Sequence, residues 1–316
     1  MLSNLRKFLV RETAGDDRFT QNAPLGAESW FGCGGTADLL FQPEDLDDLA
    51  LFLKDSPPEM PVTILGGMAN VIIRDGGVRG CVVRLGKPFA NIDIKGTRIL
   101  AGAGALNGSV AAAAAKAGIG GLEFLSGIPG TVGGAIRMNA GAYGREVKDA
   151  LIGAFGVDRR GRPEALMTTD MDMRYRYCGV PEGTFFTAAA FEGTREDKDI
   201  VRARLKDIKD KRRETQPITE KTGGSTFANP SEEELKKAGL EPGLRAWQVV
   251  EKVGGRGLTV GGAKMSEKHC NFMINTGKAT AADLEDLGEE LISRAKNLLN
   301  LDLHWEIRRL GERLST

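Results

Sequence analysis

The sequence predicts an α+β protein of about two domains, and three observations lead to this prediction. The chain has 316 residues, which is enough for two domains of about 150 residues each. Before residue 211, short β-branched stretches alternate with glycine-containing turns, as is typical of a sheet-rich region. After residue 224, the pattern indicates a smaller unit of helices with two or three strands. The segment 211–224 combines a helix end, Pro217 and Gly223-Gly224, and is therefore the predicted boundary.

The individual elements follow from apolar spacing. Strands are expected at 62–65, 71–73, 81–85 and 97–101, where β-branched residues form short runs. Helices are expected at 44–53, 107–117, 196–215, 232–238 and 281–299, most of which place apolar residues three or four positions apart. Pro43 suits the start of the first of these helices, and Thr280 is the expected N-cap of the last. The first ten residues predict a short amphipathic helix.

The composition argues against several classes of protein. Lys plus Arg and Asp plus Glu both number 43, so the net charge is 0, whereas a protein that holds nucleic acid through phosphates carries a basic surplus. No apolar run approaches the roughly 18 residues of a membrane span, and the N-terminus lacks the pattern of a signal peptide. We therefore expect a cytoplasmic protein. Its four scattered cysteines are expected to be reduced thiols, and its two histidines without an acidic cluster predict no metal site.

Glycine is the anomaly, because 42 of 316 residues is about 13%, against an average near 7%. Two clusters are candidate ligand-binding loops: Gly66-Gly67 after the expected strand 62–65, and six glycines within 127–144. Glycines let successive backbone N–H groups face an anion such as a pyrophosphate. The spacing is not Gly-x-Gly-x-x-Gly, so the Rossmann fingerprint is absent. Taken alone, either cluster is equally open to interpretation as a structural turn or a tightly packed loop.

Together, the motifs of this chain resemble those of the UDP-N-acetylenolpyruvoylglucosamine reductases, in family order from about residue 30 to 311. The matching segments are Leu65-Gly66-Gly67-Met68-Ala69-Asn70, Gly127 to Ala135, Met138 to Gly144, Tyr175-Arg176, Gly224 to Pro230, Gly261 to Phe272, and Trp305 to Arg308. Two positions depart from the family. Ala69 stands where serine is usual, and Ala228 stands where lysine is common. By this resemblance, Ala69 removes one hydroxyl from the loop that holds the phosphates, and Ala228 removes a cation near the substrate.

The resemblance implies a fold and a cofactor. It implies a two-subdomain FAD-binding unit like that of vanillyl-alcohol oxidase, with subdomains at 1–85 and 86–215. It further implies an α+β substrate-binding domain at 216–300 and a C-terminal strand, 301–316, that closes the active site. FAD would be held non-covalently by Leu65, Gly66, Gly67, Met68, Ala69 and Asn70 and by Gly127, Ile128, Pro129, Gly130, Thr131, Gly133, Gly134, Asn139, Ala140 and Gly141.

The resemblance also implies a reaction and its residues. NADPH would reduce FAD, and the enolpyruvyl ether of UDP-N-acetylglucosamine would then accept a hydride and a proton, giving UDP-N-acetylmuramate for peptidoglycan synthesis. Arg176 would grip the substrate carboxylate, Ser225 would donate the proton, and Glu306 would assist the enediolate or its protonation. Tyr175, Asn229, Lys264 and Ser266 would bind the substrate.

Other interpretations predict different properties. A related flavoprotein oxidase of alcohols or sugars would react with oxygen during turnover and would need no serine donor. A catalytically silent nucleotide-binding protein would have no need of Arg176, Ser225 and Glu306 together. Because no long insertion separates Glu182 from Glu196, the chain is expected to be of the family type that lacks a tyrosine-bearing loop over the substrate. Purified protein is expected to be yellow.

Overall fold

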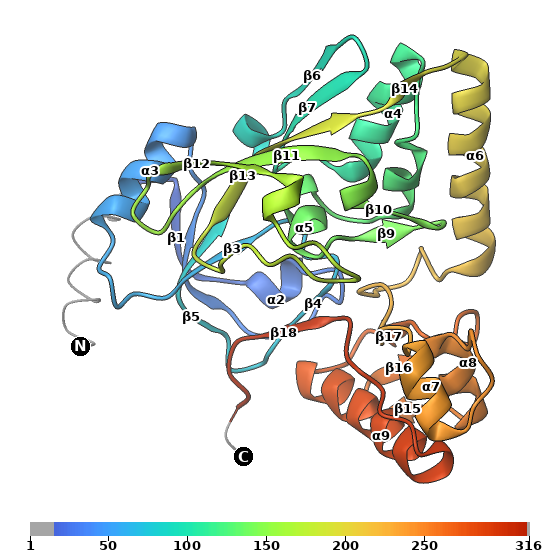
Figure 1. The fold of residues 1–316 in the computed structure, drawn as a ribbon. Coiled ribbons are helices and arrows are strands. Elements are labelled where there is room, and N and C mark those ends of the chain that lie inside the picture. Colours follow the sequence, from blue (N-terminus) through green and yellow to red (C-terminus); the bar gives the residue numbers. More distant parts are fainter. Residues whose placement is uncertain (1–15, 315–316) are drawn as a thin grey trace. The chain divides into compact units, whose positions relative to one another are not determined.

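The computed structural model describes residues 16–314, and these residues divide into two compact units (Figure 1). The first unit contains residues 16–23, 38–67 and 80–211, and the second contains 24–37, 68–79 and 212–314. The division after Lys211 falls in the segment that the sequence marks as a boundary. The helix expected in the first ten residues lies outside the described range.

The first unit begins with a four-stranded sheet in the order β1–β2–β5–β3. Its strands are β1 (Phe19–Ala23), β2 (Ala37–Phe41), β5 (Val78–Arg84) and β3 (Val62–Leu65). β3 and β5 run parallel, with Val62 opposite Cys81. Helix α3 (Leu46–Asp55) buries Leu49, Phe52 and Leu53 in a core that this sheet shares. The carboxyl end of β3 leads directly into Gly66 and Gly67.

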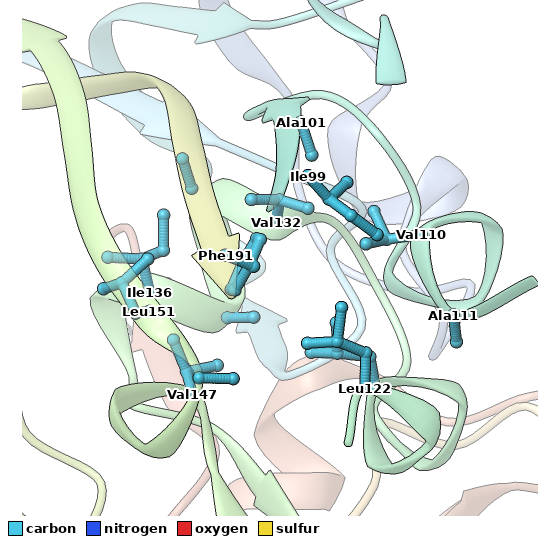
Figure 2. Close-up of a cluster of buried hydrophobic side chains, with 14 of the residues drawn as sticks. Ile99, Ala101, Val110, Ala111, Leu122, Val132, Ile136, Val147, Leu151 and Phe191 are labelled. Carbon is cyan, nitrogen blue, oxygen red and sulfur yellow. The ribbon is translucent and has the colours of Figure 1, made fainter. Parts of the chain in front are cut away.

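A five-stranded antiparallel sheet forms the larger part of the first unit. Its order is β12 (Pro163–Met167), β11 (Leu151–Val157), β13 (Phe185–Glu192), β7 (Arg98–Gly102) and β6 (Ile92–Lys95). Helices α4 (Asn107–Ala117) and α5 (Val132–Arg137) contribute to its core. Figure 2 shows Phe191 of β13 among Ile99, Val110, Val132 and Ile136 from these elements.

Smaller elements complete the first unit. β8 (Ile119–Gly120) pairs with β14 (Thr194–Arg195), and β9 (Gly141–Ala142) pairs with β10 (Arg145–Glu146). Helix α6 (Lys198–Thr215) packs Val201 and Leu205 into the same core, and its last four residues belong to the second unit. Four 3₁₀ turns lie at Lys87–Phe89, Glu123–Gly127, Val147–Asp149 and Thr168–Asp170.

The second unit combines a small antiparallel sheet with helices and a parallel pair of strands. The sheet is β15 (Thr259–Val260), β16 (Ala263–Met265) and β17 (Met273–Asn275), and the parallel pair is β4 (Val71–Ile73) with β18 (Arg308–Leu310). The helices are α2 (Leu25–Glu28), α7 (Glu232–Ala238), α8 (Ala246–Lys252) and α9 (Ala281–Leu299). Leu284, Leu287 and Leu291 of α9 are fully buried in its core.

A buried carboxylate ties the C-terminal segment to α9. The side chain of Glu285 is 1% exposed and receives hydrogen bonds from Arg74, at 2.9 Å, and from Arg313, at 2.9 Å. Arg309 of β18 lies 3.7 Å from the same carboxylate. Burial of Glu285 opposes its ionisation, but the hydrogen bonds from the two arginines outweigh that effect and hold its pKa below the usual value. Because these arginines flank β4 and β18, Glu285 fixes the ends of this strand pair.

Most elements with a strong apolar pattern lie where the sequence predicts them. The helices at 107–117, 232–238 and 281–299 have the expected limits, and the Thr280 side chain caps the last one by accepting from Asp283 N–H. The helix expected at 44–53 begins instead at Leu46, because Asp45 is its cap and accepts from Asp48 N–H. The helix expected from Glu196 begins at Lys198, because the Asp197 side chain accepts from the N–H of Asp199.

Three features of the structure add to the expectations from the sequence. The glycine segment 127–144 is not only a loop, since α5 forms within it and buries Val132, Ala135 and Ile136. The terminal strand expected over 301–308 shows the predicted alternation, with Leu301, Leu303 and Ile307 buried, but its regular strand is Arg308–Leu310. The segments 24–37 and 68–79 pack with the second unit, although the sequence places them in a first subdomain of 1–85. Their backbone hydrogen bonds account for this, since Trp30 N–H bonds Met68 and Arg308 N–H bonds Asn70.

Within residues 16–314, no helix is both long enough and apolar enough to cross a membrane. All four cysteines are free, and burial raises the pKa of Cys33 to about 11 and that of Cys81 to about 12. The region from Glu182 to Glu196 is occupied by β13 and β14, as expected from the absence of an insertion there.

Candidate functional site

The two glycine clusters of the sequence meet in the first unit. A methyl group added to Gly66 would lie 2.1 Å from the Oγ1 atom of Thr131, and one added to Gly67 would lie 3.1 Å from Gly130 Cα. The first distance is too short for any side chain and the second is tight, so bare backbone at the end of β3 lies against the Thr131 hydroxyl and the Gly130 main chain at the start of α5. Gly133 is similarly close to Ala103, at 3.1 Å. We call Gly66, Gly67, Gly130 and Thr131 the glycine cradle.

Two buried polar atoms beside the cradle have no hydrogen-bond partner in residues 16–314. These are Thr131 Oγ1 and Asn107 Oδ1, on side chains that are 7% and 0% exposed. Asn107 is tied to the cradle through its own N–H, which donates to Gly130 O at 3.1 Å. An unpaired buried polar group costs about 1–3 kcal/mol, so a ligand that completed its hydrogen bonds would be bound more tightly. Bare backbone at a helix start and the unpaired Thr131 hydroxyl, which can donate a hydrogen bond, fit the phosphates of FAD, whereas Asn107 Oδ1 can only accept from an N–H or O–H group of a ligand.

The rest of the second glycine segment is built mainly by internal contacts. The Asn139 amide donates to Glu146, at 3.0 Å, and to the Arg174 carbonyl, at 2.9 Å, while its oxygen accepts from Lys148 N–H. The Ala140 carbonyl accepts from Val147 N–H, and Gly141 pairs with Glu146 in the β9–β10 hairpin. The Asn139 side chain is thus fully committed to holding this hairpin, and any contact of Asn139 with a cofactor falls to its main chain.

Arg176 lies in a strained turn of the first unit. Its φ is +54°, a left-handed conformation that costs a residue other than glycine about 1–3 kcal/mol. The guanidinium stacks on the Tyr175 ring, 4.7 Å from its centroid, and donates to the Gly141 carbonyl at 3.4 Å. The neighbouring Arg174 instead pairs with the exposed Asp172, at 2.8 Å, as expected for a solvated residue. The two arginines therefore differ in their surroundings: the Arg176 side chain is held by Tyr175 and Gly141, whereas that of Arg174 is exposed beside Asp172.

The segments that carry Ser225 and Glu306 pair in the second unit, although 80 residues separate these two residues in the chain. The carbonyl of Thr226 accepts from Glu306 N–H at 2.8 Å, and Ala228 N–H donates to the His304 carbonyl at 2.9 Å. Phe227 and Trp305 form an antiparallel bridge, and their rings lie 5.5 Å apart. The two half-buried residues Ser225 and Glu306 are thus held on neighbouring segments, which we call the paired segments 225–228 and 304–307.

The first predicted cofactor loop continues from the first unit into the second. Met68 adopts a left-handed φ of +49°, and Ala69 is buried. The Asn70 amide donates to the Glu306 carbonyl at 3.0 Å, and the Asn70 carbonyl accepts from Arg308 N–H at 3.0 Å. Within the second unit, the side chain of Asn70 therefore supports Glu306.

The weaker substrate candidates have internal partners. Lys264 pairs with Glu267 at 2.5 Å, the Ser266 hydroxyl accepts from the N–H groups of Lys268 and His269, and Asn229 Oδ1 accepts from Ala246 N–H at the start of α8. Their binding roles stay predictions. Burial lowers the pKa of His269, whose ring packs edge-on against Phe272. In the described part of the chain, no group of three or more His, Cys, Asp or Glu residues could hold a metal ion.

Sequence reasoning missed two buried amides, Asn107 and Asn271. Asn107 appears in the sequence only as the first residue of a helix, and Asn271 only as part of a motif. A polar residue at a position that the apolar pattern marks as buried is the signal that could have found Asn107, since Val110, Ala111 and Ala114 place it on the inner face of α4.

Comparisons with known protein families define the class. Residues 37–165 match the family model of an FAD binding domain, which includes the glycine cradle. The protein is therefore an FAD-dependent oxidoreductase by fold and site. Residues 216–310 match the model of the UDP-N-acetylenolpyruvoylglucosamine reductase C-terminal domain.

Whole-chain relatives give the family. The UDP-N-acetylenolpyruvoylglucosamine reductase of Parvibaculum lavamentivorans is 49% identical over 292 residues, which cover 92% of this chain and 91% of that protein. That of Paramagnetospirillum magneticum is 49% identical over 94% of this chain and 93% of its own length. The crystal structure of the Thermus caldophilus reductase matches with a TM-score of 0.77 at 31% identity, over 93% of this chain and 98% of that chain. The chain belongs to the UDP-N-acetylenolpyruvoylglucosamine reductase family.

Proposed function

We propose that this protein reduces the enolpyruvyl ether of UDP-N-acetylglucosamine to UDP-N-acetylmuramate, with NADPH as the electron donor and FAD as a non-covalent cofactor. In the balanced reaction, NADPH gives up a hydride and becomes NADP⁺, and the substrate double bond gains that hydride on one carbon and a proton on the other. The observation that carries the proposal is the combination of the glycine cradle with its unpaired Thr131 hydroxyl in one unit and the Ser225–Glu306 pair in the other.

The first unit is proposed to bind FAD through its glycine cradle. FAD supplies the two-electron carrier that NADPH reduces and that the substrate reoxidises. The bare backbone at Gly66, Gly67 and Gly130 would leave room for its phosphates, and the unpaired Thr131 hydroxyl could donate a hydrogen bond to one of them. The unpaired Asn107 Oδ1 could accept from a hydroxyl or N–H group of the cofactor. The 3₁₀ turn that ends at Gly127, with Ile128 and Pro129 after it, leads the chain into this cradle.

The chemical roles follow from the charge that develops during the reaction. Hydride addition to an alkene conjugated with a carboxylate moves negative charge onto that carboxylate. A planar guanidinium, that of Arg176, can grip both carboxylate oxygens, which a lysine cannot do as well. Ser225 is the proposed proton donor to the adjacent carbon, and Glu306 is proposed to assist this protonation. The 216–300 region is the proposed substrate-binding domain, and the absence of a long insertion at 182–196 supports the type without a tyrosine-bearing loop.

The four unpaired cysteines support a reducing compartment, and we propose the cytoplasm. The expected ligands are small molecules, and the neutral net charge gives no support to binding of nucleic acid.

The proposal is tested by stopped-flow measurements on Ser225→Ala. Flavin reduction by NADPH is expected to proceed as in the parent protein, because that half-reaction needs no proton donor to carbon. Reoxidation of the reduced flavin by the enolpyruvyl substrate is expected to slow by about 10²–10⁴-fold, the usual contribution of a general acid. Ser293→Ala, at an exposed serine of α9 in the same unit, is the control. Normal reoxidation by Ser225→Ala, or a parent protein that the enolpyruvyl substrate does not reoxidise, would contradict the proposal.

A further inference from the structure

Asn271 lies under the segment that carries the proposed proton donor. It is 5% exposed, and its side chain makes two hydrogen bonds to the main chain of a single residue, Phe227. Asn271 Oδ1 accepts from Phe227 N–H at 2.9 Å, and Asn271 Nδ2 donates to the Phe227 carbonyl at 2.8 Å. An amide side chain that satisfies both polar groups of one residue replaces a neighbouring strand at that point.

The main chain around Asn271 continues this pairing. Its carbonyl accepts from Thr226 N–H at 2.7 Å, and the next residue, Phe272, forms an antiparallel bridge with Ser225. Three consecutive residues, Ser225 to Phe227, are therefore fixed on one side by Asn271 and Phe272. On the other side, Thr226 O receives the N–H of Glu306, and Phe227 bridges Trp305.

We infer that Asn271 is the positioning residue for Ser225 in substrate reduction, an inference that rests on the proposed function. Ser225 follows Gly224, whose φ of +82° gives the chain a turn with little steric restraint. Without the Asn271 amide, the segment that carries Ser225 loses two side-chain hydrogen bonds at Phe227, two residues beyond the reacting hydroxyl. A displacement of about 1 Å in a reacting group can slow a reaction by about 100-fold. Asn271 itself donates no proton to the substrate.

The chain supplies a matched control in Asn275. It has the same residue type, the same 5% exposure and the same unit, and its side chain also makes internal hydrogen bonds. It donates to the Phe31 carbonyl at 2.8 Å and accepts from the N–H groups of Gly277 and Ala279. Neither paired segment receives a hydrogen bond from this side chain. Loss of the Asn275 amide therefore removes no hydrogen bond from the paired segments.

The experiment measures both half-reactions in the FAD-loaded enzyme for Asn271→Ala, Asn271→Asp and Asn275→Ala. For Asn271→Ala, we expect the limiting rate of reoxidation by the enolpyruvyl substrate to fall at least tenfold at saturating substrate. Reduction by NADPH should stay within twofold of the parent rate. For Asn275→Ala, both rates should stay within twofold, even where thermal stability falls. A general structural weakening would change both half-reactions together.

Asn271→Asp gives a second measurement that remains decisive if the alanine variant does not fold. A protonated aspartic acid has a carbonyl that can accept from Phe227 N–H and an O–H that can donate to the Phe227 carbonyl, so it restores both bonds. An ionised aspartate restores only the first. Burial raises the pKa of such a group, and we expect the reoxidation rate of this variant to recover as the pH falls through that pKa, relative to the parent at each pH.

The outcomes separate this inference from the proposed function. If Ser225→Ala reoxidises normally, the proton-donor role is wrong and the positioning role falls with it. If Ser225→Ala is slow while both Asn271 variants behave as Asn275→Ala does at every pH, only the positioning role of Asn271 is overturned.

Discussion

The two candidate regions of this protein are built on opposite principles. The glycine cradle of the first unit consists of bare main chain that lies against the Gly130 main chain and the Thr131 hydroxyl, and two buried polar atoms, Thr131 Oγ1 and Asn107 Oδ1, have no partners in the described residues. In the paired segments of the second unit the main chain is bonded on both sides: Thr226, Phe227 and Ala228 each exchange main-chain hydrogen bonds with neighbours, and two asparagine amides reinforce them. One side-chain atom there, Thr226 Oγ1, is buried without a partner in the described residues.

The difference indicates what each region has to do. A region that holds a charged ligand benefits from free polar groups, because the ligand completes their hydrogen bonds. A region that places a reacting hydroxyl benefits from a main chain that is held rigidly on both sides. Substitutions in the cradle should therefore change ligand affinity, whereas substitutions in the support of Ser225 and Glu306 should change rates or stability.

Arg176 gives the strongest test of this contrast. Its side chain lies in the first unit, yet its proposed role is in the reaction. We expect Arg176→Ala to lower kcat/KM for the enolpyruvyl substrate by at least about 100-fold, since each charge-assisted hydrogen bond contributes about 1.5–3 kcal/mol. Arg176→Lys should recover part of this loss, as a point charge without the fork. Steady-state kinetics measure both.

The control is Arg174→Ala. Arg174 lies two residues before Arg176, and its exposed side chain pairs with Asp172. It should change kcat/KM by less than twofold. Equal losses for the two arginines would show that the turn, not the Arg176 guanidinium, is what the reaction needs.

Much of this arrangement follows from the sequence, for identifiable reasons. Helix 281–299 was predictable because its leucine spacing and its cap at Thr280 agree. β13 was not, because the alanines in Phe185–Glu192 carry little strand preference and its pairing partners are distant in sequence. α5 was missed because Gly133-Gly134 disfavours a helix locally, and tertiary burial of Val132 and Ile136 overrides that preference.

The candidate site shows the same limit. The motifs identify Ser225 and Glu306 as residues, but their adjacency depends on a pairing of main chains 80 residues apart. Local sequence carries no record of such a pairing. The roles of Asn70 and Asn271 as supports were invisible for the same reason, since each acts on a segment far from it in the chain.

Glu285 tests how far the stability of the second unit depends on a buried ion pair. Glu285→Gln removes the carboxylate that Arg74 and Arg313 share, and breaking a buried ion pair costs about 3 kcal/mol at the lower end of the usual range. We take the lower end because both arginines are partly exposed. Chemical denaturation at neutral pH measures the loss.

The pH dependence of the same group has a definite sign. Because the pKa of Glu285 is lowered in the folded protein from the value of 4.5, its contribution is complete above about pH 4.5 and is lost as the pH falls through the lower folded pKa. The stability difference between parent and Glu285→Gln should therefore narrow as the pH falls below 4.5. A constant difference would show that packing, not charge, is responsible.

Gly66 tests whether the cradle depends on bare backbone. In Gly66→Ala the new methyl group meets Thr131 Oγ1 at 2.1 Å, so either the hydroxyl or the backbone must move. We expect the affinity for FAD to fall about tenfold, equivalent to about 1.4 kcal/mol, as measured by titration of the apoprotein with FAD. Gly108→Ala is the control, because a methyl group there meets nothing within 4 Å and alanine favours its helix. A Gly66→Ala protein with parent affinity would exclude close backbone approach as a requirement.

Substitution of Thr131 is expected to give the smallest effect on FAD affinity. It still tests the comparison sharply, because the expected changes in apoprotein stability and in FAD affinity have opposite signs. Thr131→Val keeps the shape and removes a buried hydroxyl that has no partner in the described chain. In the apoprotein this should leave stability unchanged or raise it by about 1 kcal/mol, since an unsatisfied group is removed. Affinity for FAD should fall about three- to fivefold, since a bond to the ligand contributes about 0.5–1.5 kcal/mol. Thermal denaturation without FAD and titration with FAD measure the two effects. Loss of stability in the apoprotein would mean that the hydroxyl already serves the fold, and the contrast between an open cradle and a closed support would not hold at this residue.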